Sequence, residues 1–279
     1  MPFHSLHMLL LLPDTLAALS LSYLGAREID STVAFVSRQF HELTLNPEMW
    51  FMLCCDTGKT VLTPTPQSPL AYRAHYLSNP HIPLDAPSLR LALTMVSSSS
   101  SDTSTIIIAG GETLLESNLV ISTDCNIVVH PPTARARVVA HTSFSSTANV
   151  PLVTIAPKTI VNVQNLSFLH SSPGEDIWNG NCAIFIASGS LFMTSCSVQS
   201  SSGRGVVCVK EGVVVARSCI VHDSAATGVY SGGRSVCTLD GCNIMRNGIG
   251  GRDIPSGHSG VYIEASKAII QDCYVGSNR

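Results

Sequence analysis

Acidic residues that could perform acid–base chemistry in this sequence include Asp223, Asp240, Asp253, Glu264 and Asp272. Carboxylates that converge on a sugar together with a lysine or arginine would support glycan cleavage by general acid and base. Within the repeated units described below, these five residues occupy different positions, and only isolated basic residues accompany them. We therefore expect no catalytic cluster of carboxylates.

A histidine and an aspartate adjoin each other at His222 and Asp223, and such residues can form a catalytic pair. Consecutive residues of a strand point to opposite faces, so the two side chains cannot meet if the strand continues through both. A surface turn is the simpler interpretation. Because no other constellation is recognisable, the sequence predicts no catalytic residue, no cofactor and no intrinsic enzyme activity.

The ten cysteines are the remaining reactive side chains. Zinc sites need closely spaced ligand pairs, and the sequence has no C-x-x-C motif, so we expect no bound metal. Four cysteines recur at Cys196, Cys219, Cys242 and Cys273, at intervals of 23, 23 and 31 residues. A reduced cysteine packs as a small apolar side chain, and this pattern predicts a buried column. Disulfides between stacked cysteines would instead imply an oxidising compartment.

These cysteines belong to a longer internal repeat. Its copies are SCSVQSS from Ser195, SCIVHDS from Ser218, GCNIMRN from Gly241, DCYVGSN from Asp272 and, with leucine in place of cysteine, NLSFLHSS from Asn165. Alternating apolar and β-branched residues predict strands. Short strands joined by Gly, Ser or Asn turns, in units this small, favour a parallel β-helix.

In a parallel β-helix, equivalent residues of successive coils stack about 4.8 Å apart. The repeat therefore predicts two columns of side chains that point into the core. The first column consists of Leu166, Cys196, Cys219, Cys242 and Cys273, and the second of Phe168, Val198, Val221, Ile244 and Val275.

The segment TIIIAGGETLLESNLVIS, residues 105–122, resembles the first coil of pectate-lyase-like right-handed β-helices. We expect the amphipathic segment 86–96 before it to form a capping helix, because an uncovered coil exposes apolar side chains and unpaired backbone groups. At the other end, the sequence stops at GSNR within a coil. We expect that the chain is truncated, continues or pairs with another chain there. The β-helix domain is assigned to residues 86–279, with an incomplete C-terminal end.

The leucine-rich stretch 7–25 at the start of the chain has three possible interpretations. It is too short and too polar for a membrane span, and it lacks the positively charged residues that begin a signal peptide. Pro13 and Asp14 suit the first turn of a soluble helix, and Gly25 suits its end. We therefore expect a soluble helix and no membrane contact.

Two further helices are predicted at residues 26–37 and 46–55. Together with the first, they form a small all-α domain at 8–58, which can scarcely bury its own apolar faces and usually needs a partner. The following segment, 59–85, contains TPTPQSP and is assigned as a linker.

Three segments of this domain, LLPDTLAALSLSYLGAREI, VAFVSRQFHEL and NPEMWFMLC, resemble an F-box. In that family a Leu-Pro pair opens the first helix, a Val-Ser-Arg-x-Phe/Trp stretch follows, and a tryptophan lies in the third helix. The resemblance implies that the helices bind a Skp adaptor and, through it, a cullin. The residues that it assigns to adaptor binding are Leu12, Pro13, Leu16, Leu19, Leu24, Val36, Phe40 and Trp50.

Two coils of the repeat are about eight residues longer than the others, at the same turn, as the intervals of 31 and 23 residues indicate. Insertions at one turn map to one face of a solenoid, often its binding face. The loops would stand roughly 14 Å apart and flank a shallow groove; alternatively, they are tolerated insertions without a role. The predicted substrate-binding residues of this groove are Glu175, Asp176, Trp178, Arg204, Arg252, Asp253 and His258.

An F-box followed by a right-handed β-helix resembles the F-box only proteins that carry a β-helix substrate domain. The resemblance implies a substrate receptor of a Skp-cullin-F-box ubiquitin ligase, located in the cytoplasm, the nucleus or both, which binds a protein substrate. The alternative is a carbohydrate-active or carbohydrate-binding β-helix. A net charge of -3 without a basic block argues against nucleic acid as the main ligand.

Overall fold

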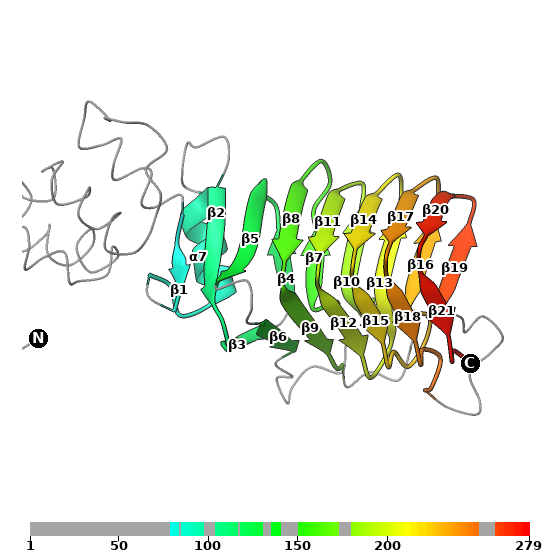
Figure 1. Cartoon of the computed structure of the whole chain (residues 1–279). Coiled ribbons are helices and arrows are strands. Elements are labelled where there is room, and N and C mark those ends of the chain that lie inside the picture. The colour runs from blue at the N-terminus through cyan, green and yellow to red at the C-terminus, as the bar shows by residue number, and fades with distance from the viewer. Residues whose placement is uncertain are drawn as a thin grey trace, which may run out of the picture.

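Three parallel sheets wind into a solenoid in the computed structural model of the chain (Figure 1). The three-helix domain expected at 8–58, with all its adaptor-binding residues, lies outside the described residues, as does most of the linker. The structure describes residues 79–83, 85–97, 104–116, 118–130, 135–140, 150–172, 180–250 and 260–279.

The largest of the three sheets, sheet A, has eight strands. In spatial order these are β1 (His81–Ile82), β2 (Ser104–Ala109), β5 (Cys125–His130), β8 (Ile160–Gln164), β11 (Ser190–Thr194), β14 (Val213–Arg217), β17 (Val236–Asp240) and β20 (Lys267–Gln271). All neighbouring pairs in this sheet are parallel.

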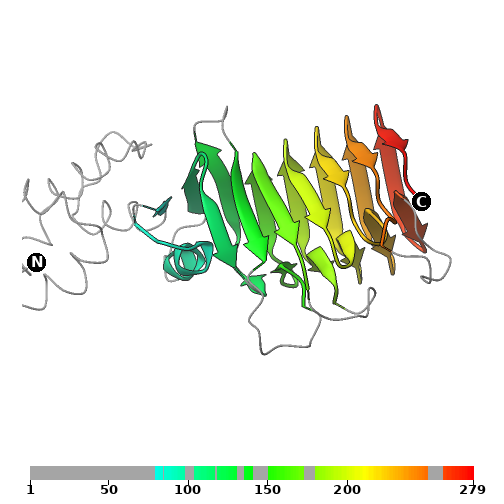
Figure 2. The ribbon, with the colours of Figure 1, turned by 90° about the horizontal axis from the view of Figure 1, so that it is seen from below.

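Sheets B and C complete the coils. Sheet B contains β3 (Thr113–Glu116), β6 (Ala136–Ala140), β9 (Leu166–His170), β12 (Ser197–Ser200), β15 (Ile220–His222), β18 (Asn243–Met245) and β21 (Tyr274–Gly276). Sheet C contains β4 (Leu119–Ile121), β7 (Val153–Ile155), β10 (Cys182–Ala187), β13 (Arg204–Val209), β16 (Val229–Gly232) and β19 (Val261–Glu264). Figure 2 shows the coils side by side along the axis of the solenoid.

A single residue with positive φ forms the corner between sheets A and B in five successive coils. Its φ lies between 51° and 59° in each of them. One residue in this conformation turns the chain sharply while the backbone stays hydrogen-bonded, as in Ser195, whose N–H donates to the carbonyl of Arg217 in the next coil. The corner residues are Asn165, Ser195, Ser218, Gly241 and Asp272.

Both predicted columns are confirmed by the strand register. Ser197 pairs with Ser167 and Ile220, which places the preceding residues Leu166, Cys196 and Cys219 at one level of successive coils. The second column runs from Phe168 through Val198, Val221 and Ile244 to Val275. Recurring apolar residues in the sequence therefore correctly predicted which side chains stack in the core.

The cysteines of the described residues are all free, and all but Cys273 are buried. Burial raises the pKa of the Cys237 thiol, and likewise that of Cys125, to about 12. Such thiols are protonated at neutral pH and pack as small apolar groups.

A helix covers one end of the solenoid, where the sequence predicted one over residues 86–96. Helix α7 spans Leu89–Ser97 and buries Leu89, Ala92, Leu93 and Val96. It packs against β1, β2 and β3. The segment expected to form the first coil, 105–122, contributes β2, β3 and β4.

The coil formed by β19, β20 and β21 differs from the coils before it. Its inward side chains Ile263, Ile270 and Val275 are exposed, whereas their partners Ser231, Leu239 and Ile244 in the preceding coil are buried. The described core is therefore open to solvent at this coil.

Candidate functional site

The turn from sheet B to sheet C is where the sequence predicted a binding groove. Of the seven predicted substrate-binding residues, only Arg204 lies among the described residues. The other six, Glu175, Asp176, Trp178, Arg252, Asp253 and His258, lie outside them. The described part of this turn includes residues 201–203, which connect β12 to β13, and 223–228, which connect β15 to β16.

Buried polar side chains hold this turn in place. The Asn247 carboxamide is fully buried; its oxygen accepts from the backbone N–H of Ser224, and its nitrogen donates to the carbonyl of Val221. Asn278 repeats the pattern one coil further on, where its oxygen accepts from the backbone N–H of Asn247 and its nitrogen donates to the carbonyl of Ile244. Such satisfied buried amides fix the backbone from which surface side chains project.

A buried histidine, His170, also holds this turn in place through hydrogen bonds. His170 Nδ1 lies 2.9 Å from Ser200 Oγ, and Nε2 lies 3.0 Å from the carbonyl oxygen of Val150. Burial lowers the pKa of His170 to about 4, so the ring is neutral at pH 7. A neutral ring with both nitrogens engaged is a structural element of the turn.

Arg204 lies over a stack of aromatic rings on the outer face of sheet C. Its guanidinium carbon is 4.6 Å from the centroid of the Tyr230 ring. On the other side, Tyr230 stacks on Tyr262 with centroids 5.8 Å apart and an angle of 7° between the ring planes. The Tyr230 hydroxyl donates to Glu264 at 2.8 Å. We call these four residues the tyrosine stack.

The register of sheet C explains the stack. Val207, Tyr230 and Tyr262 are partners in successive coils, so their side chains follow one another along the solenoid. Burial, followed by the hydrogen bond to Glu264, raises the pKa of Tyr230, which keeps its phenol protonated as a donor. Tyr262 is 41 % exposed. The stack combines aromatic surface with a cation and an anion, a combination suited to binding.

A second polar cluster lies on the outer face of sheet B. Ser197 Oγ is 3.0 Å from His222 Nε2, and His222 Nδ1 is 2.6 Å from Asp223 Oδ2. Arg246 donates to both carboxylate oxygens of Asp223, at 2.7 and 2.8 Å. We call these four residues the Ser197 cluster.

The expectation that His222 and Asp223 point away from each other is wrong. Strand β15 ends at His222, and Asp223 has a φ of 50°, so the alternation of faces does not extend to it. The left-handed conformation turns the carboxylate back toward the imidazole. The Arg246 hydrogen bonds hold the pKa of Asp223 below its usual range, with His222 adding to the effect, so the carboxylate stays ionised.

Of the other carboxylates named in the sequence, the three among the described residues lie apart from one another. Asp240 lies on sheet A, 4.0 Å from Arg217, whereas Glu264 lies on sheet C and Asp272 at a corner. Within the described ranges, no group of three or more His, Cys, Asp and Glu side chains could hold a metal ion. None of the helices in the described part is long and apolar enough to cross a membrane.

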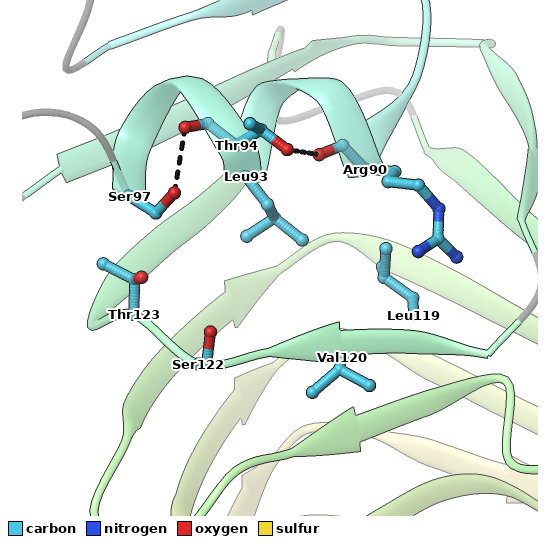
Figure 3. A pocket seen from close by; sticks show the side chains of 8 residues that line it. All are labelled: Arg90, Leu93, Thr94, Ser97, Leu119, Val120, Ser122 and Thr123. Atoms are coloured by element: carbon cyan, nitrogen blue, oxygen red, sulfur yellow. Dashed lines mark hydrogen bonds between the residues drawn. The ribbon is translucent and has the colours of Figure 1, made fainter.

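A small pocket lies between the capping helix and β4, far from both clusters (Figure 3). Its volume is about 150 Å³. The Thr94 hydroxyl donates to the carbonyl of Arg90, and the Ser97 hydroxyl to that of Thr94, so both hydroxyl protons are engaged. The lining residues are Arg90, Leu93, Thr94, Ser97, Leu119, Val120, Ser122 and Thr123.

Sequence reasoning missed Ser197, Arg246 and the two tyrosines, although the repeat held a signal for Arg246 and the tyrosines. Tyr230 and Tyr262 occupy the same place in the aligned copies GVYSG and GVYIE, and Asp223 aligns with Arg246 one coil on. Residues aligned in adjacent coils are spatial neighbours. The alignment of the repeats does not indicate the contact of Ser197 with His222, because Ser197 aligns with Ile220, two residues before His222.

Comparison with known proteins supports the fold. The family model described as "Right handed beta helix region" matches residues 153–279, which begin with β7. This part of the chain is a right-handed parallel β-helix. No curated protein and no solved structure matches the chain.

Proposed function

We propose that the chain is a substrate receptor of a Skp-cullin-F-box ubiquitin ligase. In this proposal, residues 8–58 bind the Skp adaptor, and through it a cullin, as their resemblance to an F-box implies. The β-helix binds a protein substrate with the tyrosine stack, in the cytoplasm or the nucleus, without performing bond chemistry on that substrate.

The tyrosine stack is the observation that carries the proposal for the β-helix. Tyrosine and arginine are enriched among the residues that dominate binding energy at protein interfaces. The stack projects from a hydrogen-bonded sheet, so little conformational entropy is lost when a partner binds. It also adjoins the turn whose insertions the sequence singled out, because Arg204 is the first residue after that turn.

The way the Tyr230 ring is covered favours a protein over a glycan as the binding partner. Arg204 covers one face of the Tyr230 ring and Tyr262 covers the other. The Tyr230 ring therefore offers no open face for stacking against a sugar ring, and its hydroxyl is engaged by Glu264. Edges, hydroxyls and charges suit the mixed polar and aromatic contacts of a protein interface.

The adaptor part of the proposal is tested with the full-length chain and purified Skp adaptor. Leu12→Ala/Pro13→Ala and Trp50→Ala variants should lose capture of the adaptor, because these residues match the F-box motif. The Tyr262→Ala variant should keep it. Equal capture by all four chains, or capture by none, would refute the F-box assignment.

The substrate part is tested by comparing ubiquitinated proteins in cells that express wild type, Tyr262→Ala or Tyr274→Ala. Tyr274 is the matched control, since it is a 53 % exposed tyrosine of the same coil outside the stack. Conjugates that depend on the chain should disappear with Tyr262→Ala and persist with Tyr274→Ala. Binding of the purified chain to uronate polymers, lost in Tyr262→Ala, would instead support the carbohydrate alternative.

A further inference from the structure

We propose that Ser197 is an activated nucleophile that cleaves small carboxylic esters. The activity is separate from the proposed function, because the Ser197 cluster lies on sheet B and the tyrosine stack on sheet C. The proposal rests on the geometry of three side chains in contact and a fourth that holds them.

Each nitrogen of His222 faces the partner that nucleophile activation requires. Nδ1 lies 2.6 Å from the Asp223 carboxylate, which can only accept a hydrogen bond, so the ring proton belongs on Nδ1. Nε2 then carries a lone pair and, at 3.0 Å, accepts the proton of the Ser197 hydroxyl. A nucleophile, a base and a carboxylate that orients the base are thus connected in sequence.

The register of sheet B brings the four residues of the Ser197 cluster together from three successive coils. Ser197 on β12 pairs with Ile220 on β15, and His222 lies two residues further along β15 on the same outer face. The ring therefore reaches diagonally to the serine. Arg246, just after β18, holds Asp223 by two hydrogen bonds and acts as a positioning residue.

The low exposure of the Ser197 cluster limits the size of the substrate that can reach it. Ser197 is 9 % exposed, and the side chains of His222 and Asp223 are 21 % and 27 % exposed. A nucleophile this enclosed on the outer face of a sheet can reach only a small acyl group. Gln199 lies two residues along β12 from Ser197, on the same outer face, and the proposal assigns its amide as the donor to the oxyanion. Esters suit such a site, because an ester carbonyl is more electrophilic than an amide carbonyl and an alkoxide leaves more readily than an amide anion.

The reaction consists of two balanced transfers. Ser197 Oγ attacks the ester carbonyl carbon while its proton passes to His222 Nε2. The bond from that carbon to the alcohol oxygen breaks, and the proton passes from Nε2 to the leaving alkoxide. Water then attacks the acyl-serine, gives its proton to Nε2, and releases the carboxylic acid as Ser197 regains a proton.

The first experiment treats the purified full-length chain with a fluorophosphonate, followed by peptide mass spectrometry. Ser197 should be labelled, and His222→Gln should slow the labelling by about 100-fold, because a positioned general base contributes on that order. Ser167→Ala is the matched control, since Ser167 occupies the same column one coil earlier. It should leave labelling of Ser197 unchanged.

The second experiment measures hydrolysis of p-nitrophenyl acetate. Ser197→Ala should lose about 100-fold or more of the rate, whereas Ser167→Ala should retain it. Circular dichroism of each variant establishes its folding, and labelling of the wild-type chain decides the outcome if Ser197→Ala does not fold. Labelling of wild type that spares Ser197, or that survives His222→Gln at full rate, would overturn the proposal.

Discussion

The two faces of sheet B carry different kinds of residue on the same strands. The inner face repeats small and branched apolar residues, whereas the outer face mixes polar, charged and apolar types. On β12, β15 and β18 and the residues beside them, the inner column reads Cys196, Cys219 and Cys242, and the outer cluster reads Ser197, His222, Asp223 and Arg246. In these coils of sheet B, repetition therefore marks packing, and departures from repetition mark candidate chemistry.

The physical reason is that inner positions see the same surroundings in each coil. A side chain in the column contacts its counterparts above and below, about 4.8 Å away, and must fill the same volume. Outer positions face water, where most residue types are tolerated. A polar group there can therefore be matched to a neighbour in the next coil, as Asp223 is to Arg246.

Truncation of the largest side chain in the inner columns of sheet B should have the greatest effect. Phe168 is 3 % exposed, and Phe168→Ala should lower the free energy of unfolding by about 3–5 kcal/mol, because it leaves a cavity in a closely packed core. Chemical denaturation followed by circular dichroism measures the change. A loss below about 1 kcal/mol would mean that the column tolerates gaps, unlike other protein cores.

The cysteine column should show a smaller effect that depends on position. Cys219→Ala removes one buried sulfur and should cost about 1–2 kcal/mol. Cys273→Ala, in the same column but less buried, should cost less. Equal losses in the two variants, measured by the same denaturation, would contradict the view that burial determines the role of these thiols.

Asp223 should contribute stability that depends on pH. Asp223→Asn should cost about 0.5–1 kcal/mol at pH 7, because it removes a partly exposed ion pair with Arg246. The folded-state pKa of Asp223 is lowered, so its contribution is present above the unfolded pKa of about 3.9 and is lost as the pH falls below that value. Denaturation midpoints of wild type and variant should therefore begin to converge below about pH 4 and meet only as the pH falls through the lowered folded-state pKa.

The control for this prediction is Asp240→Asn, whose carboxylate lies 4.0 Å from Arg217 and has no bidentate partner of this kind. Its effect should be smaller at pH 7. A gap between wild type and Asp223→Asn that persists unchanged into acid would show that the ion pair does not stabilise the fold.

The smallest effect is expected on the outer face away from the ion pair. Gln199→Ala should change the free energy of unfolding by no more than about 0.5 kcal/mol, because the side chain is partly exposed. Truncation of its buried neighbour, Val198→Ala, should cost several times more. If the two variants lost equal stability, the contrast between the faces of sheet B would not hold.

Much of the fold could be predicted from the sequence because the repeat is regular. The intervals between Cys196, Cys219, Cys242 and Cys273 set the coil length, and alternation set which side chains point inward. The capping helix was also predictable, since amphipathic residues precede the first coil; its observed start at Leu89 lies three residues after the expected one at Ala86.

The candidate sites were harder to predict, because their residues come from different coils and from the ends of strands. Strand alternation predicts that His222 and Asp223 point apart, but the positive φ of Asp223 brings their side chains together. Arg204 was singled out for its turn, but its contact with Tyr230 depends on where the next coil lies. The F-box assignment and the other groove residues remain predictions.

By itself, the sequence determined the period of the solenoid and the composition of its inner columns, since both follow from local alternation and recurrence along the chain. Only the tertiary structure decided which outer side chains meet. Coil stacking brings residues about 23 positions apart to hydrogen-bonding distance, as in Arg246 and Asp223, and a single left-handed residue at the end of a strand changes which face its side chain joins.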